Sequence, residues 1–183
     1  MPTKPELQVQ LQQLRDSGLA TKLAQQATAH GLAPEFLFAI ASRETDCINK
    51  LGDVQNGVAH GIGILQIDVQ HDIARQARDE GSWKTNPDPL IAFGAQMLAD
   101  SLRQVRTAFA AAPPEQQLKI TASGYNCGLG RAMAVARNGG DCDQHTTKGN
   151  YGTDVIARMK VFAELLGGES GQSPEQAPIA KSS

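Results

Sequence analysis

The chain has 183 residues, of which 40% are hydrophobic and 20% charged, and its formal net charge at pH 7 is -2. This length and composition are typical of one folded domain with enough chain to bury a core. The charge balance excludes the strongly basic face of a nucleic-acid-binding protein, so we expect no nucleic-acid partner. No apolar run approaches the roughly 18 residues needed to cross a bilayer, so we expect no membrane insertion.

Hydrophobic periodicity predicts a mainly α protein. We expect helices over residues 6–16, 19–29, 35–46 (with Pro34 at the helix start), 89–110, 115–123, 131–137 and 152–166. Between residues 51 and 67 the helical pattern breaks at several glycines, and β-branched isoleucines follow. This break favours a loop leading into a short extended segment or small hairpin. The polar segment 167–183 predicts a disordered tail after a single domain over residues 1–166.

Three cysteines, Cys47, Cys127 and Cys142, allow either one disulfide with one free thiol or three thiols. The sequence contains no C-x-x-C or H-x-x-x-H pair, so we expect no zinc site and no cofactor. The first eight residues lack the apolar segment of a secretory signal. Three explanations stay open: a non-classical export route, a signal removed from this sequence, or a phage or intracellular origin.

Glu44 is the strongest single clue to function. By the i, i+3, i+4, i+7 rule it shares one helix face with three apolar residues, Leu37, Ile40 and Ala41. Partial burial and the negative end of the helix dipole both raise the pKa of a carboxyl in this place. A carboxylic acid that stays protonated near neutral pH can protonate a leaving oxygen. The alternative is a structural carboxylate that pairs with Arg43 or caps a loop.

Four short segments along the chain carry the next clue. They read A-S-R-E at residues 41–44, G-I-G-I-L-Q-I-D at 61–68, S-G-Y-N-C-G at 123–128 and N-Y-G-T-D-V-I-A-R at 150–158. Together they resemble the signatures of the goose-type lysozymes, in the lysozyme-like and soluble lytic transglycosylase superfamily, over about residues 34–165. The resemblance implies an α+β lysozyme-like fold whose small hairpin or extended segment lines one side of a sugar-binding cleft. It also implies that Glu44 is the catalytic acid.

The resemblance implies further substrate-binding residues. In the second segment, Gly61 and Gly63 would let a sugar chain approach the backbone, because glycine has no Cβ. Gln66 would offer a donor and an acceptor to an acetamido group. His71 stands where the family often has a histidine in a sugar subsite. The alternatives are a tight turn for the glycines and a solvated helix-start residue for the histidine.

The last two segments imply an aromatic and amide contribution to the same cleft. Tyr125 and Asn126, expected to follow a helix, resemble the pair that contacts the substrate and the catalytic acid. Tyr151 would reach across the cleft toward the acid and the sugar. The alternatives are a helix-end turn for the first pair and a tyrosine at the edge of the core for the third residue.

A second carboxylate separates two reactions that this fold supports. An inverting hydrolase needs a base that holds water opposite the acid, whereas a lytic transglycosylase uses the muramyl 6-hydroxyl and gives an anhydro sugar. Asp68 closes the second segment at the position of one family aspartate, and Asp53 resembles the other, although its spacing departs from the family pattern. We therefore expect a muramidase that hydrolyses the β-1,4 bond between N-acetylmuramic acid and N-acetylglucosamine, with water positioned by these aspartates.

The alternatives are a lytic transglycosylase and a peptidoglycan-binding module without turnover. The expected partners are the glycan strands of bacterial peptidoglycan and, as with many lysozyme-like toxins, a protein inhibitor or immunity protein. We expect a monomer that acts on the cell wall in the periplasm or outside the cell. Defence, phage lysis, wall remodelling and interbacterial competition all fit such a cleft.

Overall fold

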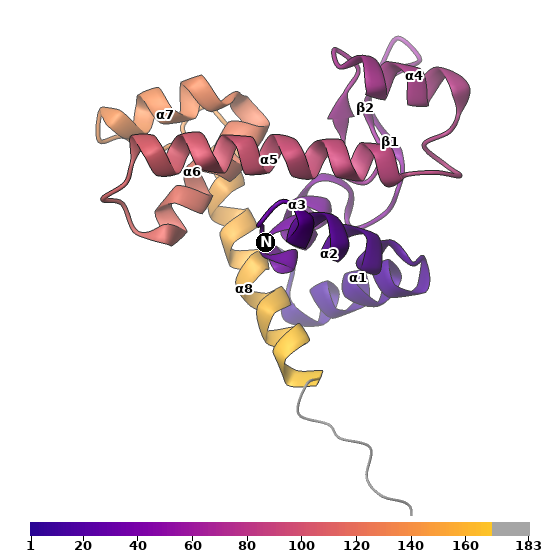
Figure 1. Ribbon diagram of the computed structural model, residues 1–183, viewed down its shortest axis with the longest axis horizontal. Helices are drawn as coiled ribbons and strands as arrows, with labels where there is room; N and C mark the ends of the chain where they lie inside the picture. Colours follow the sequence, from indigo (N-terminus) through magenta and orange to yellow (C-terminus); the bar gives the residue numbers. More distant parts are fainter. Residues whose placement is uncertain (170–183) are drawn as a thin grey trace, which may run out of the picture.

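The computed structural model describes residues 1–169, and these form a mainly helical protein with one small sheet (Figure 1). The helices are α1 (Lys4–Asp16), α2 (Leu19–Ala29), α3 (Pro34–Thr45), α4 (Asp72–Glu80), α5 (Asp88–Ala108), α6 (Pro114–Cys127), α7 (Leu129–Arg137), the 3-10 helix η1 (Thr147–Gly149) and α8 (Tyr151–Glu169). The strands are β1 (Leu51–Gln55), β2 (Val58–Ile62) and β3 (Ile67–Asp68). The expected mainly α, α+β fold is confirmed.

Most helices lie where periodicity predicts them, and α2 has the expected bounds. The prediction missed α4 because this helix is short and strongly polar, and its narrow apolar face consists only of Ile73, Ala74 and Ala77. The C-terminal prediction was wrong by a few residues, since α8 continues to Glu169 rather than ending before the expected tail. The rest of that expected tail, 170–183, lies outside the described residues.

The sheet is antiparallel with strand order β1-β2-β3, so the predicted hairpin gains a third short strand. Gln55 pairs with Val58, which leaves a two-residue turn of Asn56 and Gly57. Both turn residues have positive φ, 51° and 79°, as the tight turns of β-hairpins require. Gly61 of β2 pairs with Gly52 on one side and with Asp68 on the other. This register places the start of β1 and the end of β3 at the same level on either side of β2.

Helix α3 lies at the centre of the main hydrophobic core, and six of its consecutive residues, 36–41, are at most 2% exposed. It packs against α2 and α8, while α5 crosses the molecule from the sheet and α4 to α6 and α7 (Figure 1). A smaller cluster made of Val105, Ile120, Ala132, Met133 and Cys142 joins the far end of α5 to α6 and α7. Two apolar clusters thus fix the sheet and the α6–α7 pair at opposite ends of α5.

The cysteine question is answered by the structure: Cys47, Cys127 and Cys142 are all free thiols. Cys47 and Cys142 are buried, and Cys127 is half-buried at the end of α6. Within residues 1–169, no helix combines the length and apolar character needed to span a membrane.

Candidate active site

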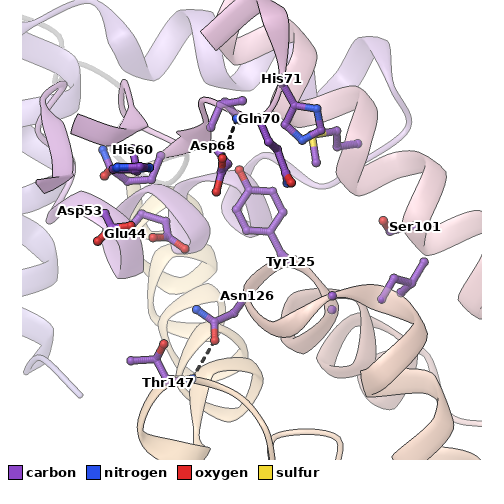
Figure 2. A pocket seen from close by; sticks show the side chains of 17 residues that line it. Glu44, Asp53, His60, Asp68, Gln70, His71, Ser101, Tyr125, Asn126 and Thr147 are labelled. Atoms are coloured by element: carbon purple, nitrogen blue, oxygen red, sulfur yellow. Dashed lines mark hydrogen bonds between the residues drawn. The ribbon is translucent and has the colours of Figure 1, made fainter. Parts of the chain in front are cut away.

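A cleft of about 720 Å³ lies between the sheet with the start of α4 on one side and α6, α7 and the middle of α5 on the other. Eight of the ten expected site residues line it, namely Glu44, Asp53, Gly61, Gln66, Asp68, His71, Tyr125 and Asn126. Figure 2 shows six of these, together with His60, around the open space. The volume falls within the roughly 300–1,000 Å³ of small-molecule sites in proteins. The cleft can therefore hold a segment of an extended polymer.

Glu44 reaches the cleft from the last turn of α3, where its side chain is half-buried. Burial raises the pKa of Glu44, although the Tyr151 hydrogen bond and the positive charge of Arg43 partly oppose that rise. A carboxyl with a raised pKa holds its proton toward neutral pH. Glu44 thus has the property expected of a general acid.

Tyr151, the first residue of α8, lies behind Glu44 and donates its hydroxyl hydrogen to Glu44 Oε1. The Arg43 guanidinium lies 5.3 Å from the centre of the Tyr151 ring. Burial and the nearby Glu44 raise the pKa of Tyr151, so the phenol stays protonated and acts as a donor. Tyr151 thus contacts the acid as expected. At 2% exposure it does not line the cleft, which departs from the expected contact with a sugar.

The two aspartates lie on the sheet side of the cleft and are exposed (Figure 2). Asp53 has a positive φ of 46° within β1, and the Gln55 amide donates to its two carboxylate oxygens at 3.2 and 3.3 Å. Asp68 ends β3, and its Oδ1 accepts the backbone N–H of Gln70 at 2.7 Å. Because Gly61 pairs with both Gly52 and Asp68, the hairpin register carries the two carboxylates to one wall.

The prediction for Gln66 needs correction, because its amide group is already engaged by the protein. Its Nε2 donates to the backbone oxygens of Lys50 at 3.1 Å and Gly63 at 2.7 Å, which uses both amide hydrogens. Its side chain also fills the space above two glycines, since a Cβ at Gly52 or Gly61 would lie within 2.4 Å of Gln66 Oε1. Gln66 therefore holds the strand ends together and has no donor left for an acetamido group.

The two glycines of this segment differ in their position relative to the cleft. Gly61 lines the cleft and also gives room to the Gln66 side chain. Gly63 is buried, has a φ of 80° and does not line the cleft. A Cβ at Gly63 would meet the Leu90 side chain at 3.2 Å. These glycines serve the backbone path and internal packing.

Tyr125 and Asn126 lie inside the last turn of α6, not after it as expected. The Tyr125 hydroxyl donates to the backbone oxygen of Leu65 at 2.8 Å, so it connects α6 to the segment before β3 and is not bonded to Glu44. Burial and the charge of Glu44 raise the pKa of Tyr125. Asn126 Oδ1 accepts the backbone N–H of Thr147 at 2.7 Å (Figure 2). Both residues line the cleft, while their polar atoms also fix its walls.

Two histidines stand on the sheet side of the cleft. His71 is the N-cap of α4, and its ring packs edge-on against Phe93 at 5.0 Å. His60, which the sequence reading did not place in the site, lies in β2 and lines the cleft near Asp53 (Figure 2). The strand pairs Gly52–Gly61 and Val54–Ala59 flank the Asp53 and His60 positions, so a correct hairpin register would have identified it.

The cleft is lined by three carboxylates and two histidines, and no Lys or Arg of residues 1–169 lines it. Among the described residues no group of three His, Cys, Asp or Glu side chains is arranged to hold a metal ion. The cleft therefore combines a half-buried carboxyl group with exposed carboxyl groups. Glycosidases that use two carboxyl groups have this arrangement.

The helical fold, its small antiparallel sheet and the carboxylate cleft between them define a lysozyme-like protein. The sequence model of the family described as Lysozyme g matches residues 16–165, and the chain belongs to that family. It is 29% identical to Lysozyme g of Gallus gallus over 133 residues, which are 73% of this chain and 58% of that protein. It is 28% identical to Lysozyme g of Casuarius casuarius over 131 residues, 72% of this chain and 65% of the relative. The chain thus spans less than two thirds of these relatives' lengths.

Lysozyme g of Epinephelus coioides is 28% identical over 153 residues, and the match covers 80% of this chain and 75% of that relative. A protein of Lottia gigantea described as glycine, glutamate and proline-rich is 31% identical over 141 residues, which are 75% of this chain but only 32% of that protein. The family's domain therefore also occurs within a much longer chain.

Proposed function

We propose that the protein is a muramidase that hydrolyses the β-1,4 bond between N-acetylmuramic acid and N-acetylglucosamine in bacterial peptidoglycan. The observation that carries the proposal is the half-buried Glu44, which faces the same cleft as two exposed aspartates, Asp53 and Asp68. Membership of the Lysozyme g family supports the same substrate class. The glycan strand is then the main partner, and the site of action is the cell wall.

In this mechanism Glu44 is the general acid. Its Oε1 accepts the Tyr151 hydroxyl, which leaves Oε2 as the oxygen that carries the transferable proton. The proton passes to the glycosidic oxygen while the bond from that oxygen to the muramyl C1 breaks. Burial favours the protonated form before the step, and the Tyr151 hydroxyl stabilises the carboxylate that remains after it.

Water completes the hydrolysis from the opposite face of the sugar, which inverts the configuration at C1. Asp53, Asp68 or both accept a proton from that water as its oxygen bonds to C1. Their solvent exposure supports this role, because water has direct access to an exposed carboxyl group. Exchange with solvent then returns a proton to Glu44 and removes one from the aspartate.

The carboxylates also bear on the rival lytic transglycosylase reaction, which needs only one acid/base. Two further carboxylates in the same cleft favour hydrolysis, since a transglycosylase has no use for a water-activating base. A sugar-binding module without turnover has no need for a carboxyl with a raised pKa. An inhibitor or immunity protein that blocks this cleft is a further proposed partner, and the monomer is the proposed state.

The test is digestion of purified peptidoglycan with mass spectrometry of the released fragments. The wild type should release reducing muropeptides, and Glu44→Gln should lower the rate by about 10²- to 10⁴-fold while strand binding is retained. Fragments lighter by one water would identify a transglycosylase instead. Undiminished lysis by Glu44→Gln would refute the assignment of the acid.

A further inference from the structure

Asp143 is a fully buried carboxylate in the loop between α7 and α8, and it lies outside the cleft. Its Oδ1 accepts the backbone N–H of Gly152 at 2.6 Å, and its Oδ2 accepts the backbone N–H of Thr153 at 2.9 Å and its hydroxyl at 2.8 Å. These two amides belong to the first turn of α8, where backbone N–H groups have no partner within the helix. Asp143 thus caps the helix that begins with Tyr151.

The same carboxylate also holds α6. The Ser123 hydroxyl donates to Asp143 Oδ1 at 2.9 Å, and the Lys119 ammonium lies 3.8 Å from Oδ2. Ser123 stands two residues before Tyr125 on that helix. Burial would raise the pKa of Asp143, but the donors of Thr153, Gly152 and Ser123 outweigh it, and the pKa is lowered. The group is therefore a carboxylate that joins two helices.

Close packing leaves the first turn of α8 little freedom to move against α6. A Cβ on Gly152 would lie 2.3 Å from the Ser123 hydroxyl, 2.6 Å from the backbone oxygen of Lys119 and 3.1 Å from Asp143 Oδ1. The backbone N–H of Tyr151 donates to the Thr146 hydroxyl at 3.1 Å, and that hydroxyl donates to the backbone oxygen of Asp143 at 2.8 Å. The start of α8 thus has one well-defined position against α6.

We propose that Asp143 is a positioning residue, which seats the first turn of α8 on α6 and thereby holds the Tyr151 hydroxyl on Glu44. Tyr151 is directly adjacent to the capped residues Gly152 and Thr153, so a shift of that turn moves its ring. The effect on function rests on the proposed role of Glu44 as the acid. The positioning itself does not, because it concerns one hydrogen bond within the folded protein.

Asp143→Asn is the most informative substitution for testing this role. Four donors, from Ser123, Gly152 and both the amide and the hydroxyl of Thr153, occupy the two carboxylate oxygens of Asp143. An amide keeps the size but presents N–H groups to one set of donors, so at least one backbone amide of α8 loses its acceptor. Asp143→Asn should therefore loosen the cap without opening a cavity.

The measurement is the pKa of the Glu44 carboxyl, followed by carbon NMR in glutamate-labelled protein and assigned with Glu44→Gln. Arg43, Tyr125 and Tyr151 interact electrostatically with Glu44, and the other titratable groups that line its cleft are Asp53, His60, Asp68 and His71. Loss of the Tyr151 hydrogen bond removes a stabiliser of the carboxylate, so the pKa of Glu44 should rise by about half to one unit. Tyr151→Phe should give this rise directly.

Asp143→Asn should move the pKa of Glu44 in the same direction, and the double variant with Tyr151→Phe should match Tyr151→Phe alone. A half-buried carboxylate on α5 supplies the control, because Asp100 bonds to Gln96 and Arg103 rather than to α8, so Asp100→Asn removes the same charge and should leave the pKa unchanged. An unchanged pKa in folded Asp143→Asn, or shifts that add in the double variant, would overturn the proposal.

If Asp143→Asn does not fold, Thr153→Val removes only the hydroxyl donor to Asp143 and should give a smaller rise. No rise in that variant would then refute the positioning role. None of these measurements uses a substrate. Wild-type protein that fails to cleave peptidoglycan, yet shows the coupled shifts, would refute the proposed function and leave the positioning role standing.

Discussion

The hydroxyl of Tyr151, at the start of α8, donates a hydrogen bond to Oε1 of Glu44, at the end of α3 and 107 residues earlier. This contact joins the first and last segments of the family signature across the main core. It favours the carboxylate form of Glu44, whereas burial favours the protonated form, and burial prevails. The pKa of Glu44 thus depends on its burial at the end of α3 and on the hydrogen bond from α8, and each of these can be changed by mutation.

Tyr151→Phe should extend activity to higher pH. The pKa of Glu44 is raised, so the active protonated form is present below that pKa and is lost as the pH rises through it. Without the phenol the pKa rises further, and the alkaline limb of the pH–rate profile should move up by about half to one unit. Tyr125→Phe is the matched control for this limb, since that hydroxyl bonds to Leu65 instead. A downward shift of the alkaline limb in Tyr151→Phe would show that the Tyr151 hydroxyl does not lower the pKa of Glu44.

Replacement of the aspartates should separate their roles. Asp53→Asn and Asp68→Asn should each slow hydrolysis, and the variant that loses the main base should fall by about 10²- to 10⁴-fold. Reaction in ¹⁸O-labelled water should place the label at the new reducing end. Full activity of the double variant, with an anhydro product and no label, would show that neither carboxylate activates water.

The helices were predictable because α2, α3, α5 and α8 carry apolar stripes that the core requires. By contrast, the apolar face of α4 is short and narrow, and the helix packs against β2, β3 and α5. Such tertiary packing is invisible to periodicity. The predicted end of α6 was also too early, since Tyr125 is helical and its hydroxyl makes a tertiary contact with Leu65.

The site was predictable where a signature residue points into the cleft, as for Glu44, Asp53 and Asp68. It was not predictable where a polar side chain turns inward, because the Gln66 amide could equally serve a ligand or the backbone. Only the positions of Lys50 and Gly63 decide between the two. The partner of a polar group is a property of the tertiary structure.

Gly61→Ala should destabilise the protein by displacing the Gln66 side chain. The new Cβ would lie 2.4 Å from Gln66 Oε1, and the displaced amide would release two backbone acceptors, so the cost should be about 1–3 kcal/mol in denaturant unfolding. In a Gln66→Ala background the same change should cost less, because the obstructing atom is gone. Equal costs in the two backgrounds would show that Gly61 acts through something other than Gln66.

Thiol reactivity should follow burial. Burial raises the pKa of Cys47 to about 12 and also raises the pKa of Cys127 and Cys142. The folded protein should therefore react slowly with a thiol reagent at pH 8, and Cys127 should react first because it is the least buried. Cys127→Ser should remove that phase, and unfolding should expose the other two. Rapid reaction of Cys47 in the native state would contradict its placement.

The acidic lining of the cleft has a consequence for how the protein meets its target. Since no Lys or Arg of residues 1–169 lines it, the cleft exerts no long-range attraction on an anionic polymer. Capture of the proposed glycan strand would then rely on contacts made at close range, through hydrogen bonds and the apolar faces of sugar rings. The association rate then depends on diffusion and shape complementarity, and it should not fall as added salt screens the charges.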